Sequence, residues 1–232
     1  MELENRNVLI TGASRGLGRA LAEYFASAGA RVVAVARQSR DLEEVVATIR
    51  SNGGIAHAIA ADIGDKRAVH PIAHRATALV GDIDILINNA STLGATPLRP
   101  LLDTDCEDLE RVLAVNLVGP FRLTKIVAGS MALRERGLVI NISSDAAVEA
   151  YPTWGSYSVS KAALDHLTRI WSAELAASGV RFIAVDPGEM NTAMHAAAIP
   201  GANPDELADP AEVAKRIAAL VESAAEEVRV AA

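Results

Sequence analysis

The sequence contains one cysteine, no long basic run and fewer basic than acidic residues. Cys106 alone excludes an internal disulfide and any cysteine-based metal cluster, and the five histidines are scattered without ligand spacing, so no metal site is expected. The 22 basic and 29 acidic residues give a net charge of −7. This balance argues against a nucleic-acid partner, because binding to a phosphate backbone needs a concentrated positive face.

Signals for export and for membrane insertion are also missing. The first ten residues are charged and lead directly into a strand-like run, which is unlike a signal peptide. No apolar stretch approaches the roughly 18–20 residues of a membrane span. With a single cysteine, these features lead us to expect a cytoplasmic protein with no membrane partner.

The chain has no internal repeat, no low-complexity segment and no Pro/Gly/Ser-rich linker. Short runs rich in Val and Ile alternate with longer stretches of helical spacing. The runs are Val8–Ile10, Val32–Ala36, Ile55–Ala60, Ile83–Ile87, Leu138–Ile142 and Val180–Val185, and the main helical stretches are Leu17–Ala28, Leu42–Arg50, Leu109–Leu133 and Ala162–Ala177. Such alternation implies parallel βαβ units, and continuous apolar runs imply strands buried on both faces. We therefore predict a single α/β domain over residues 1–232: a doubly wound, Rossmann-type fold with a mostly parallel, seven-stranded sheet flanked by helices.

One stretch is expected to lack regular structure. Residues from Gly188 to Asp209 contain two prolines and two glycines and show no sustained helical period, so we expect a mobile loop there.

A glycine-rich turn follows the first predicted strand and precedes a helix. Gly12 permits the tight turn, Gly16 lets the backbone approach a phosphate, and Gly18 lets helix and strand pack closely. Free backbone N–H groups at such a helix start attract a pyrophosphate. The spacing departs from Gly-x-Gly-x-x-Gly, and a purely structural turn is the alternative, but the strand–turn–helix context favours a dinucleotide. The cofactor-binding candidates in this turn are Gly12, Ser14, Arg15, Gly16, Leu17 and Gly18.

The end of the second predicted strand bears on the choice of cofactor. NAD-binding enzymes usually carry an acidic residue there for the ribose 2′-hydroxyl, whereas this chain has Arg37 and no carboxylate at the strand tip. Arg37 and Arg15 can pair with a 2′-phosphate, and the hydroxyl of Ser14 or Ser39 can donate to it. Ordinary solvated charges are the alternative for both arginines. The pattern favours NADP(H) over NAD(H).

Tyr157 and Lys161 lie four residues apart at the start of a predicted helix, so they share one helix face. A nearby ammonium stabilises a phenolate, so we expect a lowered pKa for Tyr157 that suits proton transfer. Taken alone, this spacing occurs by chance in many helices.

Other polar residues stand in a fixed order around this pair. Ser144 lies 13 residues before Tyr157, Asn88-Asn89-Ala90 follows the fourth strand, Asn116 lies in a long helix, and Pro187-Gly188 and Thr192 follow the sixth strand. In order and spacing, the set resembles the short, single-domain branch of the short-chain dehydrogenase/reductase family over roughly residues 5 to 192.

The resemblance implies catalytic roles. Tyr157 would be the general acid in reduction and the base in oxidation, and Lys161 would lower its pKa and hold the nicotinamide ribose. Ser144 would hydrogen-bond the substrate carbonyl oxygen as charge develops on it. Asn116 would anchor a water that relays protons from Lys161 to solvent.

The resemblance also implies cofactor contacts beyond the glycine turn. Asn89 and Ala90 would line the adenosine side, Asp62 and Ile63 would touch the adenine, and Pro187, Gly188 and Thr192 would position the nicotinamide. The chain departs from the family in two places. Ser91 stands where Asn-Asn-Ala is usually followed by Gly, and the terminal run Glu227–Ala232 is short.

The predicted partners are a small-molecule substrate and a second copy of the chain. The long, alanine-rich helices Leu109–Leu133 and Ala162–Ala177 suit packing across a two-fold axis, so we expect a homodimer or a homotetramer, and the short terminal run favours the dimer. The substrate wall is expected to be mostly apolar, with His195 a solvated loop residue; its members are Val148, Tyr151, Trp154, Met190, Met194 and Ile199.

The expected function is therefore NADPH-dependent interconversion of an alcohol and a carbonyl, that is, a ketone, an aldehyde or a 3-oxoacyl group. One alternative is a catalytically silent, NADP-sensing module of the same fold, against which Ser144, Tyr157 and Lys161 count. The other is a sugar-nucleotide epimerase or dehydratase, which would need a further C-terminal substrate domain.

Overall fold

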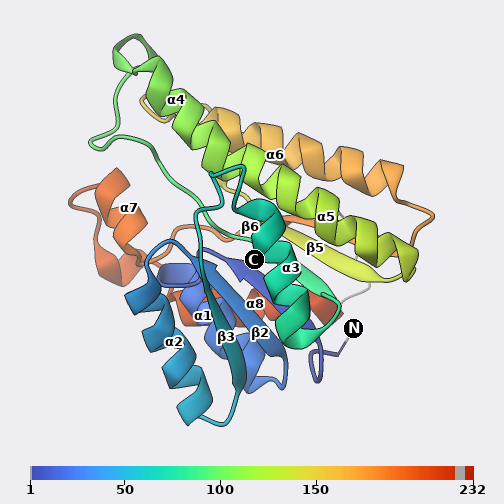
Figure 1. The fold of residues 1–232 in the computed structure, drawn as a ribbon. Coiled ribbons are helices and arrows are strands. Elements are labelled where there is room, and N and C mark those ends of the chain that lie inside the picture. Colours follow the sequence, from blue (N-terminus) through green and yellow to red (C-terminus); the bar gives the residue numbers. More distant parts are fainter. Residues whose placement is uncertain (1, 223–227) are drawn as a thin grey trace.

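The computed structural model describes residues 2–222 and 228–232. Its centre is one seven-stranded sheet in the order β3-β2-β1-β4-β5-β6-β7, with every neighbouring pair parallel (Figure 1). The strands are β1 Asn7–Thr11, β2 Arg31–Ala36, β3 Ile55–Ala60, β4 Ile85–Asn88, β5 Gly137–Ile142, β6 Val180–Asp186 and β7 Arg229–Ala231. The predicted doubly wound, seven-stranded sheet is confirmed.

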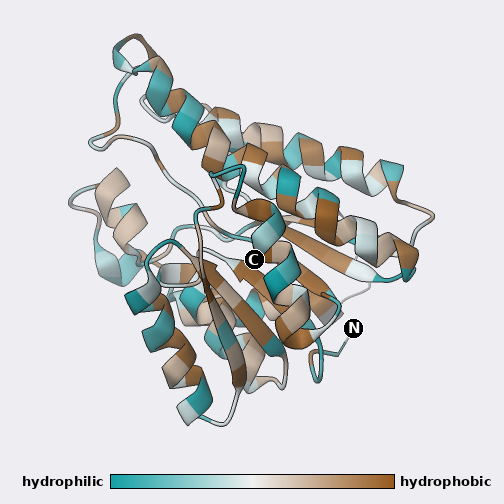
Figure 2. Cartoon of the chain, viewed as in Figure 1, coloured by the Kyte–Doolittle hydropathy of each residue, from teal (hydrophilic) through white to brown (hydrophobic). Residues whose placement is uncertain are grey.

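Alternating side chains of the strands build two separate cores. On β1, Val8 and Ile10 face one core and Leu9 faces the other, and all three are fully buried. The first core is closed by α1 Gly16–Ser27, α2 Ser39–Ser51 and α8 Pro210–Glu222. The second is closed by α3 Val69–Val80, α5 Gly119–Leu133 and α6 Gly155–Glu174. Figure 2 shows the strands as predominantly hydrophobic and the helices as mixed, as expected for strands buried on both faces.

The predicted helix Leu109–Leu133 is longer and less regular than expected. The helical stretch starts with α4 Cys106–Leu113, passes through a π-helical turn at Ala114–Val118, and continues as α5. Cys106 is exposed at the helix start. Single π turns change the helical repeat locally, which periodicity counting alone does not detect, and they occur often at functional sites.

The stretch Cys106–Leu133 contradicts the expectation that no apolar stretch approaches the length of a membrane span. Among the described residues it is the one helix long and apolar enough to span a membrane by length and composition. Core helices of soluble proteins pass the same test, and the buried side chains of α5 include Leu123, Val127 and Met131, which pack into the second core.

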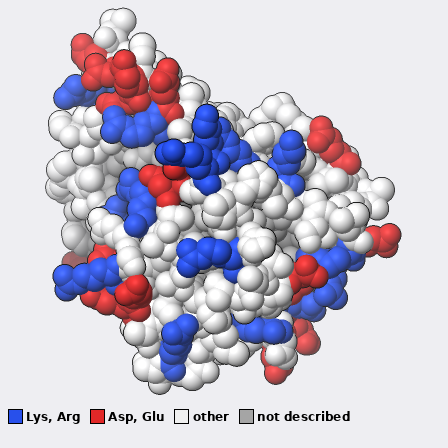
Figure 3. All heavy atoms as spheres, in the orientation of Figure 1, with Lys and Arg blue, Asp and Glu red and all other residues white. Residues whose placement is uncertain are grey.

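The stretch from Gly188 to Asp209 is not wholly irregular. It contains the short helix α7 Ala193–Ala198, whose start is capped by the Thr192 hydroxyl, which accepts a hydrogen bond from the His195 backbone N–H. In Figure 1, α7 lies beyond the carboxyl ends of the strands, to one side of the sheet. On the face of the molecule that Figure 3 shows, basic and acidic groups are interspersed.

Candidate functional site

A cavity of about 510 Å³ lies where the carboxyl ends of the strands meet. Its walls include the turns after β1, β2, β3, β4, β5 and β6, which surround the point where the strand order reverses between β1 and β4. Crevices at such switch points are the usual ligand sites of doubly wound sheets. The predicted site residues that line the cavity are Gly12, Ser14, Arg15, Gly16, Leu17, Gly18, Arg37, Asp62, Ile63, Asn89, Ala90, Ser144, Tyr157, Lys161, Pro187, Gly188 and Thr192.

The glycine turn has no room for larger residues at two positions. Gly12 has φ +69°, and a Cβ there would lie 2.8 Å from the Cα of Ala90. A Cβ on Gly18 would lie 2.2 Å from the carbonyl oxygen of Gly12. Asn89 holds this turn closed, because its Nδ2 donates to the carbonyls of Thr11 (2.9 Å) and Gly12 (3.2 Å). The Asn89 side-chain amide therefore serves the turn, while Asn89 and Ala90 also line the cavity.

The start of α1 fits an anion such as a pyrophosphate. Arg15 stands at the N-cap position without a capping side-chain hydrogen bond, and the first turn of α1 contains no acidic residue. The first N–H groups of a helix have no partner within it, and the helix dipole adds positive potential there. The residues present thus fit the dinucleotide that the strand–turn–helix motif predicts.

Charged residues gather at the outer end of the cavity, beyond β2. Arg15 and Arg37 are both exposed, and neither guanidinium has a hydrogen bond or ion pair with the residues that the structure describes. Asp41, in the first turn of α2, also lines the cavity and is the carboxylate that sequence reasoning missed. Ser39 does not serve the site, because its hydroxyl donates to Glu43 at 2.7 Å.

The catalytic candidates meet at the inner end of the cavity. Tyr157 and Lys161 are nearly completely buried on α6, and Ser144 lies two residues after the end of β5. The ammonium of Lys161 donates to the carbonyl of Ile142 at 2.6 Å and lies 5.5 Å from the centre of the Tyr157 ring. Trp154 packs edge-on against Tyr157, which screens the phenol from water on that side.

Burial moves the pKa values of Tyr157 and Lys161 apart, because it raises the first and lowers the second. Desolvation raises the pKa of Tyr157 to about 12, and a hydrogen bond with Ser144 only partly offsets that rise. Desolvation lowers the pKa of Lys161 to about 8, against the opposing charge of Asp165. The expected lowering of the Tyr157 pKa is therefore wrong for the protein alone. Taking the phenolate out of water outweighs the attraction of an ammonium that is directed at the Ile142 carbonyl.

Asn116 lies in the π-helical turn, outside the cavity lining, and its side chain ties two elements together. Its Oδ1 accepts from the Thr92 backbone N–H at 2.8 Å, and its Nδ2 donates to the Thr92 carbonyl (2.9 Å) and the Ser160 hydroxyl (3.0 Å). Asn116 thus links the loop after β4 to the helix that carries Tyr157. Its role in holding a water stays a prediction.

The part of the cavity expected to face the substrate, next to Ser144 and α7, is more acidic than expected. Asp145 accepts hydrogen bonds from the hydroxyls of Ser144 (2.8 Å) and Tyr151 (2.8 Å), and these bonds hold its pKa low although burial alone would raise it. Glu189 lies 3.4 Å from Nε2 of His195. The His195 side chain is only 11% exposed and lines the cavity, so it is not a solvated loop residue.

Two further corrections concern the wall. Val148 is 66% exposed and does not line the cavity. Ser91, where the family usually has Gly, does line it, and the Ser91 hydroxyl acts to lower the pKa of Tyr157. The other apolar and aromatic wall residues are placed as predicted: Tyr151, Trp154, Met190, Met194 and Ile199.

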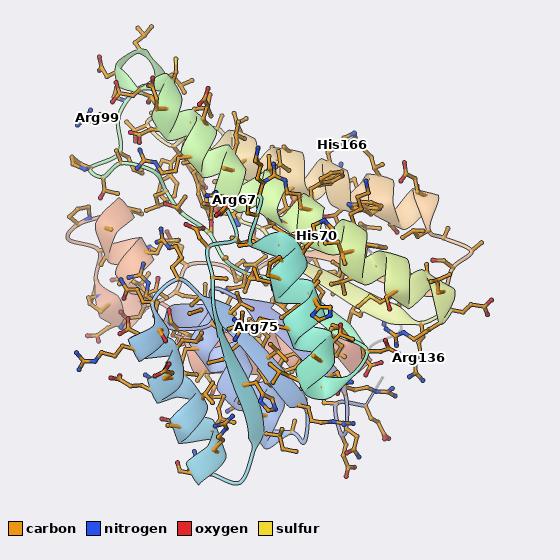
Figure 4. The ribbon with its side chains drawn as sticks, viewed as in Figure 1. Arg67, His70, Arg75, Arg99, Arg136 and His166 are labelled. Atoms are coloured by element: carbon orange, nitrogen blue, oxygen red, sulfur yellow. The ribbon has the colours of Figure 1, made fainter. Side chains whose placement is uncertain are left out.

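A second cavity, of about 480 Å³, lies between α2, β3 and α3. It is lined by Glu43, Arg50, His57 and Arg75 among others, and it contains none of the predicted site residues. Figure 4 shows Arg75 on α3, and this residue does not line the main cavity. The candidate site is therefore the first cavity.

Known proteins share this arrangement. The family model described as short chain dehydrogenase matches residues 6–202. The chain is 36% identical to L-xylulose reductase from Homo sapiens over 193 residues, which is 83% of this chain and 75% of that protein. It spans only 63% of the length of a short chain dehydrogenase from Pseudocercospora fijiensis, to which it is 38% identical over 198 residues.

Solved structures agree over nearly the whole chain. A metagenomic short-chain oxidoreductase in complex with NADP is 31% identical, with a TM-score of 0.85 over 100% of this chain and 98% of that one. An alcohol dehydrogenase from Thermococcus sibiricus, complexed with 5-hydroxy-NADP, is 26% identical, with a TM-score of 0.88 over 98% of this chain and 95% of that one. With the strand order, the glycine turn and the buried Tyr157–Lys161 pair, these matches establish that the chain belongs to the short-chain dehydrogenase/reductase family of oxidoreductases.

Proposed function

We propose that the protein is an NADPH-dependent oxidoreductase that interconverts a carbonyl group of a small molecule and an alcohol, with Tyr157 as the general acid and base. The observation that carries this proposal is that Ser144, Tyr157 and Lys161 line the same cavity as the glycine turn. A bound nicotinamide cofactor would supply the hydride.

The residues of this chain supply the proton, the hydrogen bonds and the positive charge that the reaction needs. Tyr157 holds a proton at its hydroxyl throughout the physiological range because its pKa is about 12, so it is ready to protonate a substrate oxygen in reduction. The Ser144 hydroxyl provides a second hydrogen bond for that oxygen as charge develops on it. Lys161 supplies positive charge behind the phenol, where it favours the phenolate left after proton transfer. Trp154 and the α7 segment exclude water from the reacting groups.

The preference for NADP(H) is supported by the two unpaired arginines at the outer end of the cavity. A guanidinium matches a phosphate in charge and geometry, whereas a 2′-hydroxyl offers it much less. The NADP complex of the metagenomic relative is consistent with this choice. Asp41 counts against the preference for NADP(H), because a carboxylate at this end of the cavity favours a ribose hydroxyl over a 2′-phosphate.

The substrate is proposed to be an uncharged ketone, aldehyde or 3-oxoacyl compound. Trp154, Met190 and Ile199 offer apolar surface, and the carboxylates Asp145 and Glu189 disfavour an anionic group next to the reacting carbon.

The experiment is a screen of carbonyl compounds and alcohols that follows the absorbance of the reduced nicotinamide with both cofactors. Wild-type protein should turn over at least one uncharged carbonyl with NADPH. Tyr157→Phe removes only a hydroxyl, so it should keep the fold and NADPH binding but lose about 10²-fold or more in rate. Ser144→Ala should lose about 10²-fold with cofactor affinity intact. A Tyr157→Phe variant with the wild-type rate contradicts the mechanism, and NADPH binding without turnover of any compound favours a cofactor-sensing module.

A further inference from the structure

Arg229, on the edge strand β7, reaches three separate parts of the candidate site. Strand β7 pairs in parallel with β6, and this places Arg229 beside Ala184. Its Nε donates to Asp165 at 2.8 Å, and its Nη2 lies 3.1 Å from the carbonyl oxygen of Ser144 and 3.4 Å from Asp186. Each acceptor belongs to a different element: α6, the segment after β5, and the end of β6.

The contact with Asp165 fixes the helix that carries Tyr157 and Lys161. Asp165 lies one helical turn after Lys161, on the same face of α6, and is 5% exposed. Its second oxygen, Oδ1, is buried without a hydrogen-bond partner in the described part of the chain. Among the described residues, Arg229 is the one cation paired with this buried carboxylate. A buried carboxylate holds its cation firmly, because separating the pair would leave a desolvated charge.

The other two contacts fix the groups that face Tyr157 across the cavity. The backbone of Ser144 determines where its hydroxyl lies, and Arg229 holds the carbonyl of that residue. Asp186 accepts from the backbone N–H of Gly188 at 3.1 Å, so the contact of Arg229 with Asp186 extends to the Pro187–Gly188 turn.

We propose that Arg229 is a positioning residue, which sets the distances among Ser144, the Tyr157 helix and the Pro187–Gly188 turn although it does not line the cavity itself. The planar guanidinium suits this role because it presents several N–H groups in fixed directions, which a lysine ammonium cannot reproduce. The inference rests on the proposed function, since these are the groups that the reaction would bring together.

The chain contains a second arginine with similar partners, at a place that is remote from the cavity. Arg134, just after α5, donates to the carbonyl of Ile83 at 2.6 Å and lies 3.4 Å from Asp84 and 3.6 Å from Asp82. These partners surround the amino end of β4, at the opposite edge of the sheet from the cavity. Figure 4 shows Arg136, which also contacts Asp84, at that edge. Arg134→Lys is therefore a matched control for Arg229→Lys.

The experiment compares the two lysine variants with wild-type protein. We measure urea unfolding, NADPH affinity by fluorescence, kcat and KM, and the kinetic isotope effect with NADPH deuterated at the transferred position. Both variants should unfold at lower urea concentration. Only Arg229→Lys should lose about tenfold or more in kcat, bind NADPH several-fold more weakly and show a larger isotope effect, because small misplacements of reacting groups slow hydride transfer steeply.

Two outcomes overturn the proposal: a folded Arg229→Lys protein with wild-type kcat, NADPH affinity and isotope effect, or equal kinetic losses in Arg134→Lys. If Arg229→Lys does not fold, the double variant Arg229→Gln/Asp165→Asn removes both charges of the pair and is tested in its place. It should fold and show the same losses, and wild-type kinetics in it would again contradict the proposal. If wild-type protein reduces no carbonyl compound, the proposed function fails, while the NADPH affinities still decide the role of Arg229.

Discussion

At the scale of single residues, the pKa values of Tyr157 and Lys161 are shifted in opposite directions from those of the free groups. The phenol holds its proton more tightly than in water, with a pKa of about 12, and the ammonium holds its proton less tightly, with a pKa of about 8. Burial is the main cause in both cases, because it disfavours whichever form is charged. Near neutral pH the pair is therefore a neutral acid next to a cation that is close to losing its charge.

The pH profile of reduction should follow Lys161 rather than Tyr157. As pH rises through about 8, Lys161 loses the charge that favours the phenolate, so kcat/KM should fall there, well below the pKa of the phenol. The measurement is kcat/KM for NADPH-driven reduction across neutral and alkaline pH. A profile that stays flat until the phenol itself ionises would contradict the assignment.

The same burial predicts that Lys161 lowers stability. Its pKa is about 8 in the folded protein against 10.5 for the free group, so its burial opposes folding at neutral pH, and this effect disappears between pH 8 and 10.5 as the unfolded chain alone stays protonated. Lys161→Met should raise the free energy of unfolding by about 1–3 kcal/mol at neutral pH, allowing for the lost bond to Ile142, while abolishing turnover. Urea unfolding at pH 7 and at pH 10 is the test. A Lys161→Met variant that is less stable than wild type at pH 7 would show that burial of the ammonium does not oppose folding.

Cofactor choice should depend on two oppositely charged residues at one end of the cavity. Arg37→Asp replaces attraction to a 2′-phosphate with repulsion, so NADPH binding should weaken by about 2 kcal/mol or more while NADH binding is unchanged or improved. Asp41→Asn should shift the preference the other way, toward NADPH. Fluorescence titration with both cofactors tests this, and a wild-type protein that prefers NADH would overturn the argument from the end of β2.

At the scale of elements, the sequence predicts well those parts that leave a regular pattern of apolar residues or of glycines. Five strands, β1, β2, β4, β5 and β6, appear as continuous apolar runs because both of their faces are buried. The edge strand β3 also appears as an apolar run, although it is only partly buried. The turn from β1 to α1 is visible because glycine is required twice within it. The π-helical turn before α5, the capped helix α7, and the carboxylates Asp41 and Asp145 were missed. Each depends on contacts between segments distant in the sequence or on a local hydrogen bond, which periodicity does not record.

Two glycines in helices should respond to alanine in opposite directions. In α5, a Cβ on Gly129 would meet nothing within 4 Å, so Gly129→Ala should stabilise the protein by about 0.5–1 kcal/mol through helix propensity. In α1, Gly18→Ala would force a Cβ against the Gly12 carbonyl at 2.2 Å, so it should destabilise the fold and abolish NADPH binding. Urea unfolding with and without NADPH distinguishes them. A Gly18→Ala protein that binds NADPH normally would contradict the close packing described for this turn.

At the scale of the whole molecule, we propose a homodimer through the outer face of α5 and α6. Phe121, Leu133, Val159 and Ile170 leave large apolar side chains exposed on these helices. Light scattering at micromolar concentration should give twice the mass of the chain, and Ile170→Glu should shift the equilibrium toward the monomer. Leu79→Glu, on α3, changes a similarly exposed leucine away from that face and serves as the control. A wild-type monomer would refute this arrangement.

The order of strands in the sheet has a consequence for how the molecule folds. The central pair joins Val8 on β1 to Ile85 on β4, and no two neighbouring strands form a hairpin. Local contacts alone therefore cannot nucleate the sheet, and loops must close before long-range strand pairs stabilise them. Strand β1 is synthesised before β4, so one of its two edges stays uncovered until β4 pairs with it. Until then, the exposed edge of β1 is available to the wrong partner, and we expect refolding yield to fall steeply as protein concentration rises.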